Sequence, residues 1–243
     1  MIIFFAADSF GQIGQLVTRL HKKAQEIDRA PDWVFHVGSF GAWPDPKHTD
    51  RATRESGLST DFHEYYLGNK ALPYPILFAP GRHEDHRWLE LQYQKGYFEI
   101  LPNLHRMPNG FARVLDVAGE RLSVLTLGGV FSPVVYRGDK KRKRSWAHFT
   151  KRDVEKACSV GPVDLLLCTE AGYGTQIGVH RSQAAGLNNI CFATRPALMV
   201  HGHYNVSERY VNQVTKTRCL SLGYGAVVAY QWSPGYQLFK LLG

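Results

Sequence analysis

Ile76-Leu77-Phe78-Ala79-Pro80-Gly81-Arg82-His83-Glu84-Asp85-His86 is an apolar run that stops at a Pro-Gly pair and continues into charged and titratable residues. A short apolar run that ends in turn residues is typical of a buried strand in an α/β sheet, opening into a crevice. This strand end delivers the side chains Arg82, His83, Glu84 and His86. We expect the other strand ends to gather around them and form a phosphate-type site.

The length and composition predict one ordinary globular domain over residues 1–243, with 44% hydrophobic and 21% charged residues. The apolar run Met1–Ala7 is followed by Asp8 and is too short for a signal peptide or a membrane-spanning helix. We therefore expect an intracellular protein, cytoplasmic or nuclear, without a membrane partner. The four scattered cysteines indicate buried thiols rather than disulfide bonds or a zinc site.

The formal net charge of +8 favours polyanionic partners such as nucleic acid. Part of this charge is concentrated in five consecutive basic residues, Lys140, Lys141, Arg142, Lys143 and Arg144. Three interpretations of this basic cluster stay open: contact with nucleic acid, a nuclear-import signal, or a solvated loop. It lies in a loop that we expect to be an insertion over residues 132–148.

Hydrophobic periodicity predicts an alternation of strands and helices. Strands are expected over 1–7, 33–38, 72–79, 104–107, 110–117, 121–127, 163–168, 197–200, 209–213, 217–222 and 226–230. Helices are expected over 12–27, 60–67, 87–94 and 151–159, the last of which begins with a capping box formed by Thr150 and Asp153. The three strands within 104–127 read as a meander, and the polar segment 47–59 as a mobile insertion. The predicted fold class is α/β, a β-sandwich flanked by helices.

Four short motifs follow apolar strands in a fixed order: Asp8-Ser9-Phe10-Gly11, Gly38-Ser39, Gly81-Arg82-His83-Glu84 and Gly202-His203-Tyr204-Asn205. This series resembles the motifs of the calcineurin-like metallophosphoesterases. Further tracts resemble the RNA lariat debranching enzyme and its CwfJ-type relatives: residues 62–68, 100–105, 129–132, 136–137 and 148–150. The resemblance implies a metallophosphoesterase-like fold and an RNA phosphodiester as the ligand.

The departures from the family pattern affect the metal ligands. At the matching positions the chain has Phe10 for a histidine, Ser39 for the bridging carboxylate, Arg82 for an asparagine, Thr169 for a histidine and Asn205 for a histidine. Of the ligands, Asp8 and His203 are kept, and they would belong to different metal sites. A catalytic divalent ion needs about three protein ligands. We therefore expect no metal cofactor, unless Glu170, Asp85 or Asn205 rescues one site; an active form would use a divalent metal such as Mn, Fe or Zn.

Several side chains of the expected crevice have both functional and structural interpretations. His83 matches the family residue that protonates the leaving group, but it could also simply brace its loop together with Glu84. Arg82 could hold a phosphate in place of metal, or form a salt bridge to Asp8 or Glu84. His203 could face His83 for metal-free acid and base catalysis on RNA, or be structural. Asp8 could cap the helix that begins near Gln12.

The residues expected to bind phosphate or nucleic acid are Arg82, Tyr136, Arg137 and the basic cluster Lys140–Arg144. Tyr136 and Arg137 belong to the loop that, by the resemblance, recognises branched RNA. The sequence thus favours a non-catalytic domain that binds RNA or another phosphodiester, or that acts as a scaffold for protein partners. The alternative is an active phosphodiesterase that uses His83.

Overall fold

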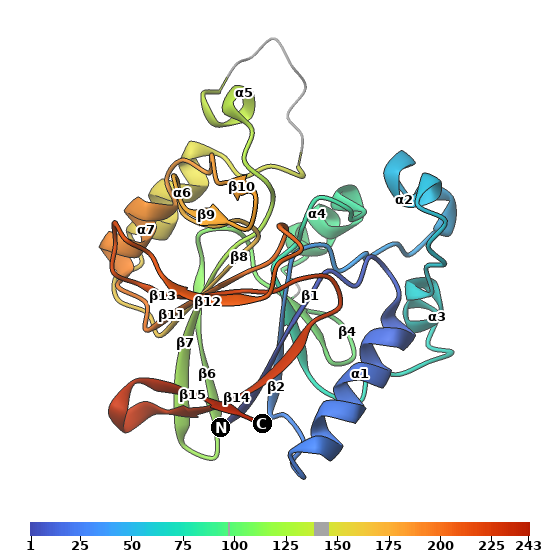
Figure 1. The fold of residues 1–243 in the computed structure, drawn as a ribbon. Helices are drawn as coiled ribbons and strands as arrows, with labels where there is room; N and C mark the ends of the chain where they lie inside the picture. Colours follow the sequence, from blue (N-terminus) through green and yellow to red (C-terminus); the bar gives the residue numbers. More distant parts are fainter. Residues whose placement is uncertain (97, 139–145) are drawn as a thin grey trace.

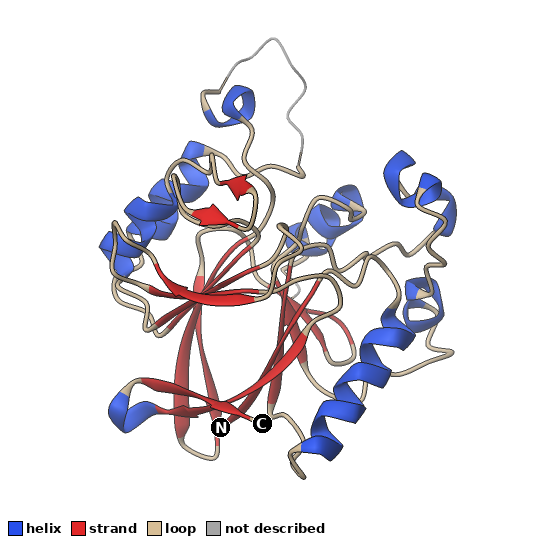
Figure 2. Ribbon diagram, in the orientation of Figure 1, coloured by secondary structure: helices blue, strands red, loops and turns tan. Residues whose placement is uncertain are grey.

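A computed structural model describes residues 1–96, 98–138 and 146–243, and it contains two β-sheets packed face to face with helices outside them (Figures 1 and 2). The predicted β-sandwich flanked by helices is therefore confirmed. In the described part of the chain, no helix is both long and apolar enough to cross a membrane.

The first sheet has seven strands, and in spatial order they are β15 (Leu238–Leu242), β14 (Val227–Ser233), β1 (Ile2–Ala7), β2 (Trp33–Val37), β3 (Ile76–Phe78), β5 (Leu104–Arg106) and β4 (Glu99–Leu101). The central strands β1, β2, β3 and β5 run parallel. Their carboxyl ends therefore meet at one edge of the sheet, where binding crevices of α/β folds form.

The second sheet has six strands, in the order β12 (Glu208–Val211), β13 (Arg218–Ser221), β11 (Leu198–His201), β8 (Leu165–Cys168), β7 (Glu120–Leu127) and β6 (Ala112–Val117). The strands β7, β8, β11 and β13 are parallel. A separate two-stranded sheet pairs β9 (Gln176–Ile177) with β10 (His180–Arg181).

The helices are α1 (Ile13–Glu26), α2 (Arg51–Glu55), α3 (Phe62–Tyr66), α4 (His86–Gln94), α5 (Pro133–Tyr136), α6 (Lys151–Cys158) and α7 (Leu187–Thr194), with 3-10 turns η1 (Pro46–His48) and η2 (Pro234–Tyr236). The predicted capping box of α6 is present. Helix α7 was not predicted, although its buried residues Leu187, Ile190, Cys191 and Thr194 follow helical spacing.

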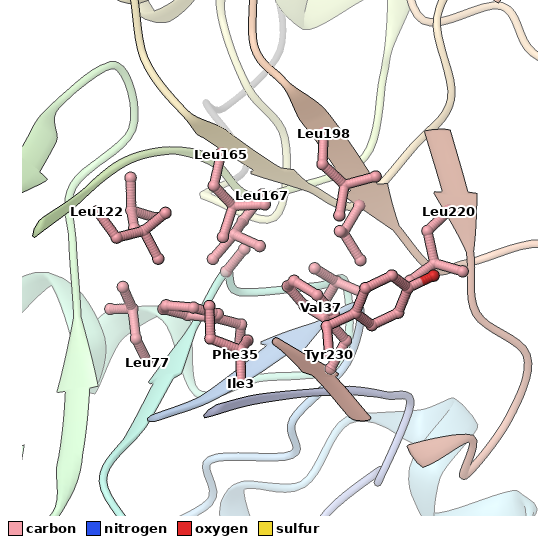
Figure 3. Packing of buried hydrophobic residues seen from close by; sticks show 14 of the residues in the cluster. Ile3, Phe35, Val37, Leu77, Leu122, Leu165, Leu167, Leu198, Leu220 and Tyr230 are labelled. Carbon is pink, nitrogen blue, oxygen red and sulfur yellow. The ribbon is translucent and has the colours of Figure 1, made fainter. Parts of the chain in front are cut away.

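The main core lies between the two sheets. Figure 3 shows Phe35 and Leu77 of the first sheet facing Leu165 and Leu167 of the second, and all four side chains are fully buried. A second cluster packs α1 against the outer face of the first sheet through residues such as Leu16. Because β1–β3 are covered on both faces, they are almost wholly apolar and their polar residues begin only where the strands end.

The structure corrects two sequence expectations about local order. The strands within 104–127 are not a single meander, because β5 pairs with β3 in the first sheet, whereas β6 and β7 form a hairpin in the second. Pro108 and Gly110 interrupt the run between them, and Gly110 has a φ of +76° that favours glycine. The turn of this hairpin is formed by Ala118 and Gly119.

The segment 47–59 is also different from the mobile insertion that was expected. It contains helix α2, whose N-cap is Asp50, with the carboxylate accepting a hydrogen bond from the backbone N–H of Thr53 at 2.7 Å. The polar residues of this segment therefore include a helix-start signal that was not recognised in the sequence.

Candidate functional site

Loops that follow strands of both sheets meet at one edge of the sandwich, where hydrogen bonds connect Asp8, Ser39, His83 and His203. We call this place, together with the neighbouring Arg82, the strand-end crevice. Direct contacts join the two sheets beside it: the N–H of Gly129 donates to Pro80 O at 2.6 Å, and the Thr169 hydroxyl donates to the same oxygen at 3.2 Å. The prediction that strand ends from both sheets gather around the loop after β3 is therefore supported by these contacts.

Asp8 connects the loops that follow β2 and β11. Its Oδ1 accepts the Ser39 N–H at 3.0 Å, and its Oδ2 accepts the His203 N–H at 3.3 Å. The side chain is buried, and burial raises the pKa of Asp8 to about 6. The suggested cap for α1 is wrong, because Gln12 occupies the N-cap position and Asp8 lies outside the helix.

Glu84 turns inward and holds two backbone segments together, the loop after β2 and its own loop after β3. Its two carboxylate oxygens accept N–H groups from Phe40, Gly41, Ala42 and Gly81 at 2.7 to 3.1 Å. Burial raises the pKa of Glu84 to about 7, although all four hydrogen bonds favour the ionised form. The structural interpretation of Glu84 as a brace of its loop is confirmed, and this carboxylate does not face the crevice.

His83 is paired with a carboxylate from another part of the chain. Its Nδ1 lies 2.7 Å from Oδ2 of Asp50, the N-cap of α2. The imidazole also contacts the ring of Phe10 edge-on, with 5.6 Å between ring centroids. Phe10 and His83 border an apolar pocket of about 200 Å³ whose other lining residues lie in α2 and just after it. The pairing fixes the ring and leaves Nε2 free of the contact with Asp50.

Arg82 is exposed and forms no ion pair within the described residues. The salt bridge to Asp8 or Glu84 that was considered from the sequence is therefore not formed. The pKa of His203 is lowered by burial, and next by the positive charge of Arg82 and by His180 and His83. The charges of Arg82 and His83 therefore both act on His203, and a shared binding role of the three side chains stays a prediction.

His86 does not point into the strand-end crevice with its neighbours. Its Nε2 lies 3.2 Å from the backbone oxygen of Arg82, and the ring borders a different pocket together with Arg106. Burial lowers the pKa of His86 to about 4, so the ring is neutral near pH 7.

The remaining donors do not fit a dinuclear metal centre. Thr169 already donates its hydroxyl to Pro80, Asn205 Oδ1 accepts the Tyr224 N–H at 3.0 Å, and the Phe10 ring stacks on Tyr224. Within residues 1–96, 98–138 and 146–243, no three His, Cys, Asp or Glu side chains are grouped closely enough to hold an ion. A catalytic ion needs about three such ligands.

The residues considered as substitute metal ligands have other contacts. Glu170 Oε1 accepts the Phe131 N–H at 2.9 Å, and Asp85 caps α4 by accepting the Trp88 N–H at 3.0 Å. The permanent charge of Arg82 further disfavours a cation in the crevice. The residues present therefore do not fit the metal pair of the resembling family.

The other predicted nucleic-acid-binding residues lie away from the crevice or outside the described part. Tyr136, on α5, packs against Phe131 and Phe149 with ring centroids 5.4 and 6.2 Å apart. Arg137 follows α5 and is exposed. Lys140, Lys141, Arg142, Lys143 and Arg144 fall outside the described residues, so their role stays a prediction.

Sequence reasoning missed Asp50 and His180. Asp50 lies in the polar segment 47–59 and belongs to none of the four motifs. The signal that could have revealed it is its position as an N-cap, because Asp is a common residue at the start of a helix. His180 lies on the short strand β10, and its ring is 6.2 Å from that of Tyr204.

No family model and no curated protein sequence matches the chain. Solved structures, in contrast, share its fold. The chain superimposes on TT1561 of Thermus thermophilus with a TM-score of 0.59 and 10% identity, covering 100% of this chain and 98% of that one. A phosphatase from Mycoplasma pneumoniae gives a TM-score of 0.50 at 11% identity, covering 100% of this chain and 91% of that one.

The chain has a metallophosphoesterase-type fold. GAP50 of Plasmodium, described as the anchor in the inner membrane complex, also shares this arrangement, with a TM-score of 0.53 and 13% identity over 96% of this chain and 81% of that one. The identities are low, so the comparisons establish the metallophosphoesterase-type fold and leave the closer relation to the lariat debranching enzyme a prediction.

Proposed function

We propose that the strand-end crevice binds a phosphate-bearing ligand, RNA first, without dinuclear metal catalysis. The observation that carries this proposal is Arg82: an exposed guanidinium, without an ion-pair partner in the described residues, beside His83 and His203 at the crevice. A guanidinium presents a planar fork of donors that can bind two phosphate oxygens at once.

The accessible charge of the crevice favours an anion. Asp8 and Glu84 are buried, and both carboxylates are occupied by backbone N–H donors. Asp50 is engaged by His83 and by the Thr53 N–H. Arg82 is thus the exposed charge of this group, and it occupies the position where the resembling family has a neutral metal ligand.

RNA is the preferred ligand because the net charge of +8 includes five consecutive basic residues. Contacts between basic side chains and phosphates make affinity depend steeply on salt, because binding releases counterions. A non-catalytic domain could instead act as a scaffold within a larger assembly and bind no RNA. The RNA-binding experiment below distinguishes these two roles.

The test is the affinity of the protein for a single-stranded RNA oligonucleotide over a series of salt concentrations. Replacing Arg82 by Ala should weaken binding about tenfold and reduce the salt slope by about one phosphate contact. Arg29→Ala is the matched control, since it removes an equal charge from an exposed position before β2, at the opposite end of that strand. It should leave the affinity nearly unchanged.

A second variant replaces the five residues from Lys140 to Arg144 by Gln. It should also weaken RNA binding and flatten the salt slope. If the unmodified protein binds no RNA at low salt and purifies with a protein partner, the scaffold interpretation replaces RNA binding.

One specific contact favours a second function, hydrolysis of a phosphodiester with His83 as general acid. The carboxylate of Asp50 at Nδ1 orients the imidazole. In this alternative a water molecule attacks phosphorus and loses its proton to solvent, while the proton on Nε2 passes to the leaving oxygen as its bond to phosphorus breaks. Hydrolysis of bis(4-nitrophenyl) phosphate by the unmodified protein, lost in a folded His83→Ala variant, would support this alternative. An inactive unmodified protein would remove it.

A further inference from the structure

A second pocket, separate from the strand-end crevice, lies between helices α4 and α6 and has a volume of about 240 Å³. Helix α4 packs on the outer face of the first sheet and α6 on the outer face of the second (Figure 1). We call this cavity the α4/α6 pocket and define it by three aromatic and three cationic side chains: Tyr93, Phe111, Trp146, Arg106, Arg152 and Lys156. Its volume is somewhat below the roughly 300–1,000 Å³ of typical ligand pockets, so a small ligand would be only partly enclosed.

The aromatic side chains of this pocket are unusually accessible. Tyr93, Phe111 and Trp146 are 39%, 43% and 49% exposed. They are three of the eight large aromatic side chains that are exposed in the described part of the chain, yet all three border one cavity. Aromatic faces gathered in a concave site offer stacking surface to a planar ring.

The cations of the pocket outnumber the free carboxylates. Arg106 donates from Nη1 to the Leu89 carbonyl at 3.0 Å, and its buried Nε has no partner among the described residues. Lys156 lies over the ring of Phe111, 5.3 Å from the centroid. Arg152 adds a third positive charge from the first turn of α6.

Two carboxylates also border the pocket, but only one is free to oppose these cations. Asp153 forms the capping box of α6, where its Oδ2 accepts from the N–H and the hydroxyl of Thr150 at 2.8 and 2.7 Å. Glu90 is close enough to Arg106 to raise its pKa, against the larger lowering caused by burial. The histidines there, His86 and His148, each have a contact to a backbone oxygen.

We infer that the α4/α6 pocket binds a nucleotide, with the base against Trp146, Phe111 and Tyr93 and the phosphate on the three cations. Stacking on an aromatic side chain accepts any base, and cations that converge beside the stack supply the phosphate contact. Neither feature depends on the strand-end crevice, so the inference goes beyond the proposed function.

The pocket and the crevice share a wall. His86 borders the pocket, and its Nε2 contacts the backbone oxygen of Arg82. Asn109, also at the pocket, exchanges two hydrogen bonds with Gly128, next to the Gly129 that binds Pro80. A nucleotide in the α4/α6 pocket would therefore lie directly behind the loop that carries Arg82.

The test is isothermal titration calorimetry of the unmodified full chain with AMP, UMP, adenosine and inorganic phosphate. We expect AMP and UMP to bind with similar affinity, and adenosine and phosphate to bind at least tenfold more weakly, because each uses only half of the pocket. Trp146→Ala and Arg152→Gln should each weaken AMP binding about tenfold. Both side chains are at the surface, and circular dichroism verifies that the variants are folded.

Two further variants make the result specific. Tyr236→Ala removes an aromatic side chain that is 87% exposed and lies outside the pocket, so AMP binding should not change. Arg82→Ala separates the two sites: AMP binding that survives this variant belongs to the α4/α6 pocket, whatever the variant does to RNA affinity.

Three outcomes would overturn the inference. The first is no heat of binding with millimolar AMP. The second is equal affinity for AMP and inorganic phosphate, which would leave a general anion site. The third is AMP binding that is lost in Arg82→Ala but kept in Trp146→Ala, which would place the nucleotide in the strand-end crevice.

Discussion

His83 and Asp50 are paired across 33 positions of sequence, with Nδ1 of the imidazole 2.7 Å from Oδ2 of the carboxylate. His83 belongs to the loop after β3, and Asp50 is the N-cap of α2. The contact thus fixes a short peripheral helix to the candidate site. Hydrogen bonds from Thr53 and His83 outweigh the burial that would raise the pKa of Asp50, so the net effect lowers it.

The first prediction concerns the energy of this pair. A double-mutant cycle with His83→Ala and Asp50→Asn should give a coupling free energy of about 1 kcal/mol, since Asn still caps α2 but loses the charge. Asp50→Ala should cost about 1 kcal/mol more than Asp50→Asn, because it also removes the cap. Urea unfolding measures each value, and additive effects of the two substitutions would contradict the pairing.

The second prediction concerns Glu84. Glu84→Ala should lower the free energy of unfolding by about 3 kcal/mol or more, because four buried N–H groups lose their acceptor. Glu84→Gln should cost less, since one carbonyl oxygen remains. Thermal and urea unfolding provide the measurement.

A matched control for Glu84 is available on the surface. Glu55 forms an exposed ion pair with Arg51, and Glu55→Ala should change the free energy of unfolding by less than about 0.5 kcal/mol. Equal losses for Glu55→Ala and Glu84→Ala would show that the inward carboxylate does not brace the loops.

The third prediction concerns metal content. Protein purified without chelators should contain fewer than one transition-metal ion per chain, since the remaining ligands do not form a set of three. Ser39→Asp combined with Arg82→Asn should raise manganese uptake by restoring the family pattern at two positions. Phe10 and Thr169 limit the gain. Elemental analysis measures both proteins, and two ions per unmodified chain would refute the metal-free interpretation.

The fourth prediction concerns stability against pH. Burial lowers the pKa of His36 to about 3 and of His86 and His201 to about 4, so between pH 6.5 and 4.5 the unfolded chain binds more protons at these rings than the folded chain does. Stability is therefore lost as the pH falls through this window. The raised pKa values of Asp8 and Glu84 act in the opposite direction, but their combined shift is smaller.

The expected net loss between pH 6.5 and 4.5 is about 2 kcal/mol. His36→Gln should remove most of this dependence, since one titrating ring accounts for about 1.4 kcal/mol per pH unit. Urea unfolding at several pH values measures the slope of each protein against its own value at pH 7. Constant stability of the unmodified protein down to pH 4.5, or an unchanged slope in His36→Gln, would contradict the prediction.

Much of the fold could be predicted because its central strands are local apolar runs with turn residues behind them. We could predict β3 from the apolar run Ile76–Ala79 and its end from the Pro80-Gly81 break. The order of the motifs predicted where the neighbouring strands end. The capping box Thr150–Asp153 located α6. These signals lie within a few residues of one another, so a single sequence contains them.

Features that depend on contacts between distant residues could not be predicted in the same way. The sequence placed Glu84 and His86 beside Arg82, but only tertiary packing turns Glu84 toward the N–H groups after β2 and His86 toward Arg106. The same limit explains why the partner of His83 was missed, since Asp50 lies in a polar segment without a motif. Likewise, β5 and β6 are near in sequence but belong to different sheets.

Asp8 has a mechanical consequence. It follows β1 of the first sheet, and its Oδ2 accepts the N–H of His203, which follows β11 of the second. The carboxylate thus links the two sheets by a hydrogen bond at the edge where their strands end. Burial raises its pKa to about 6. Protonation weakens its two hydrogen bonds to backbone N–H groups but also removes a buried charge, and the raised pKa shows that the second effect is the larger. A position that holds metal in the resembling family thus carries, in this chain, a hydrogen-bonded link between the two sheets.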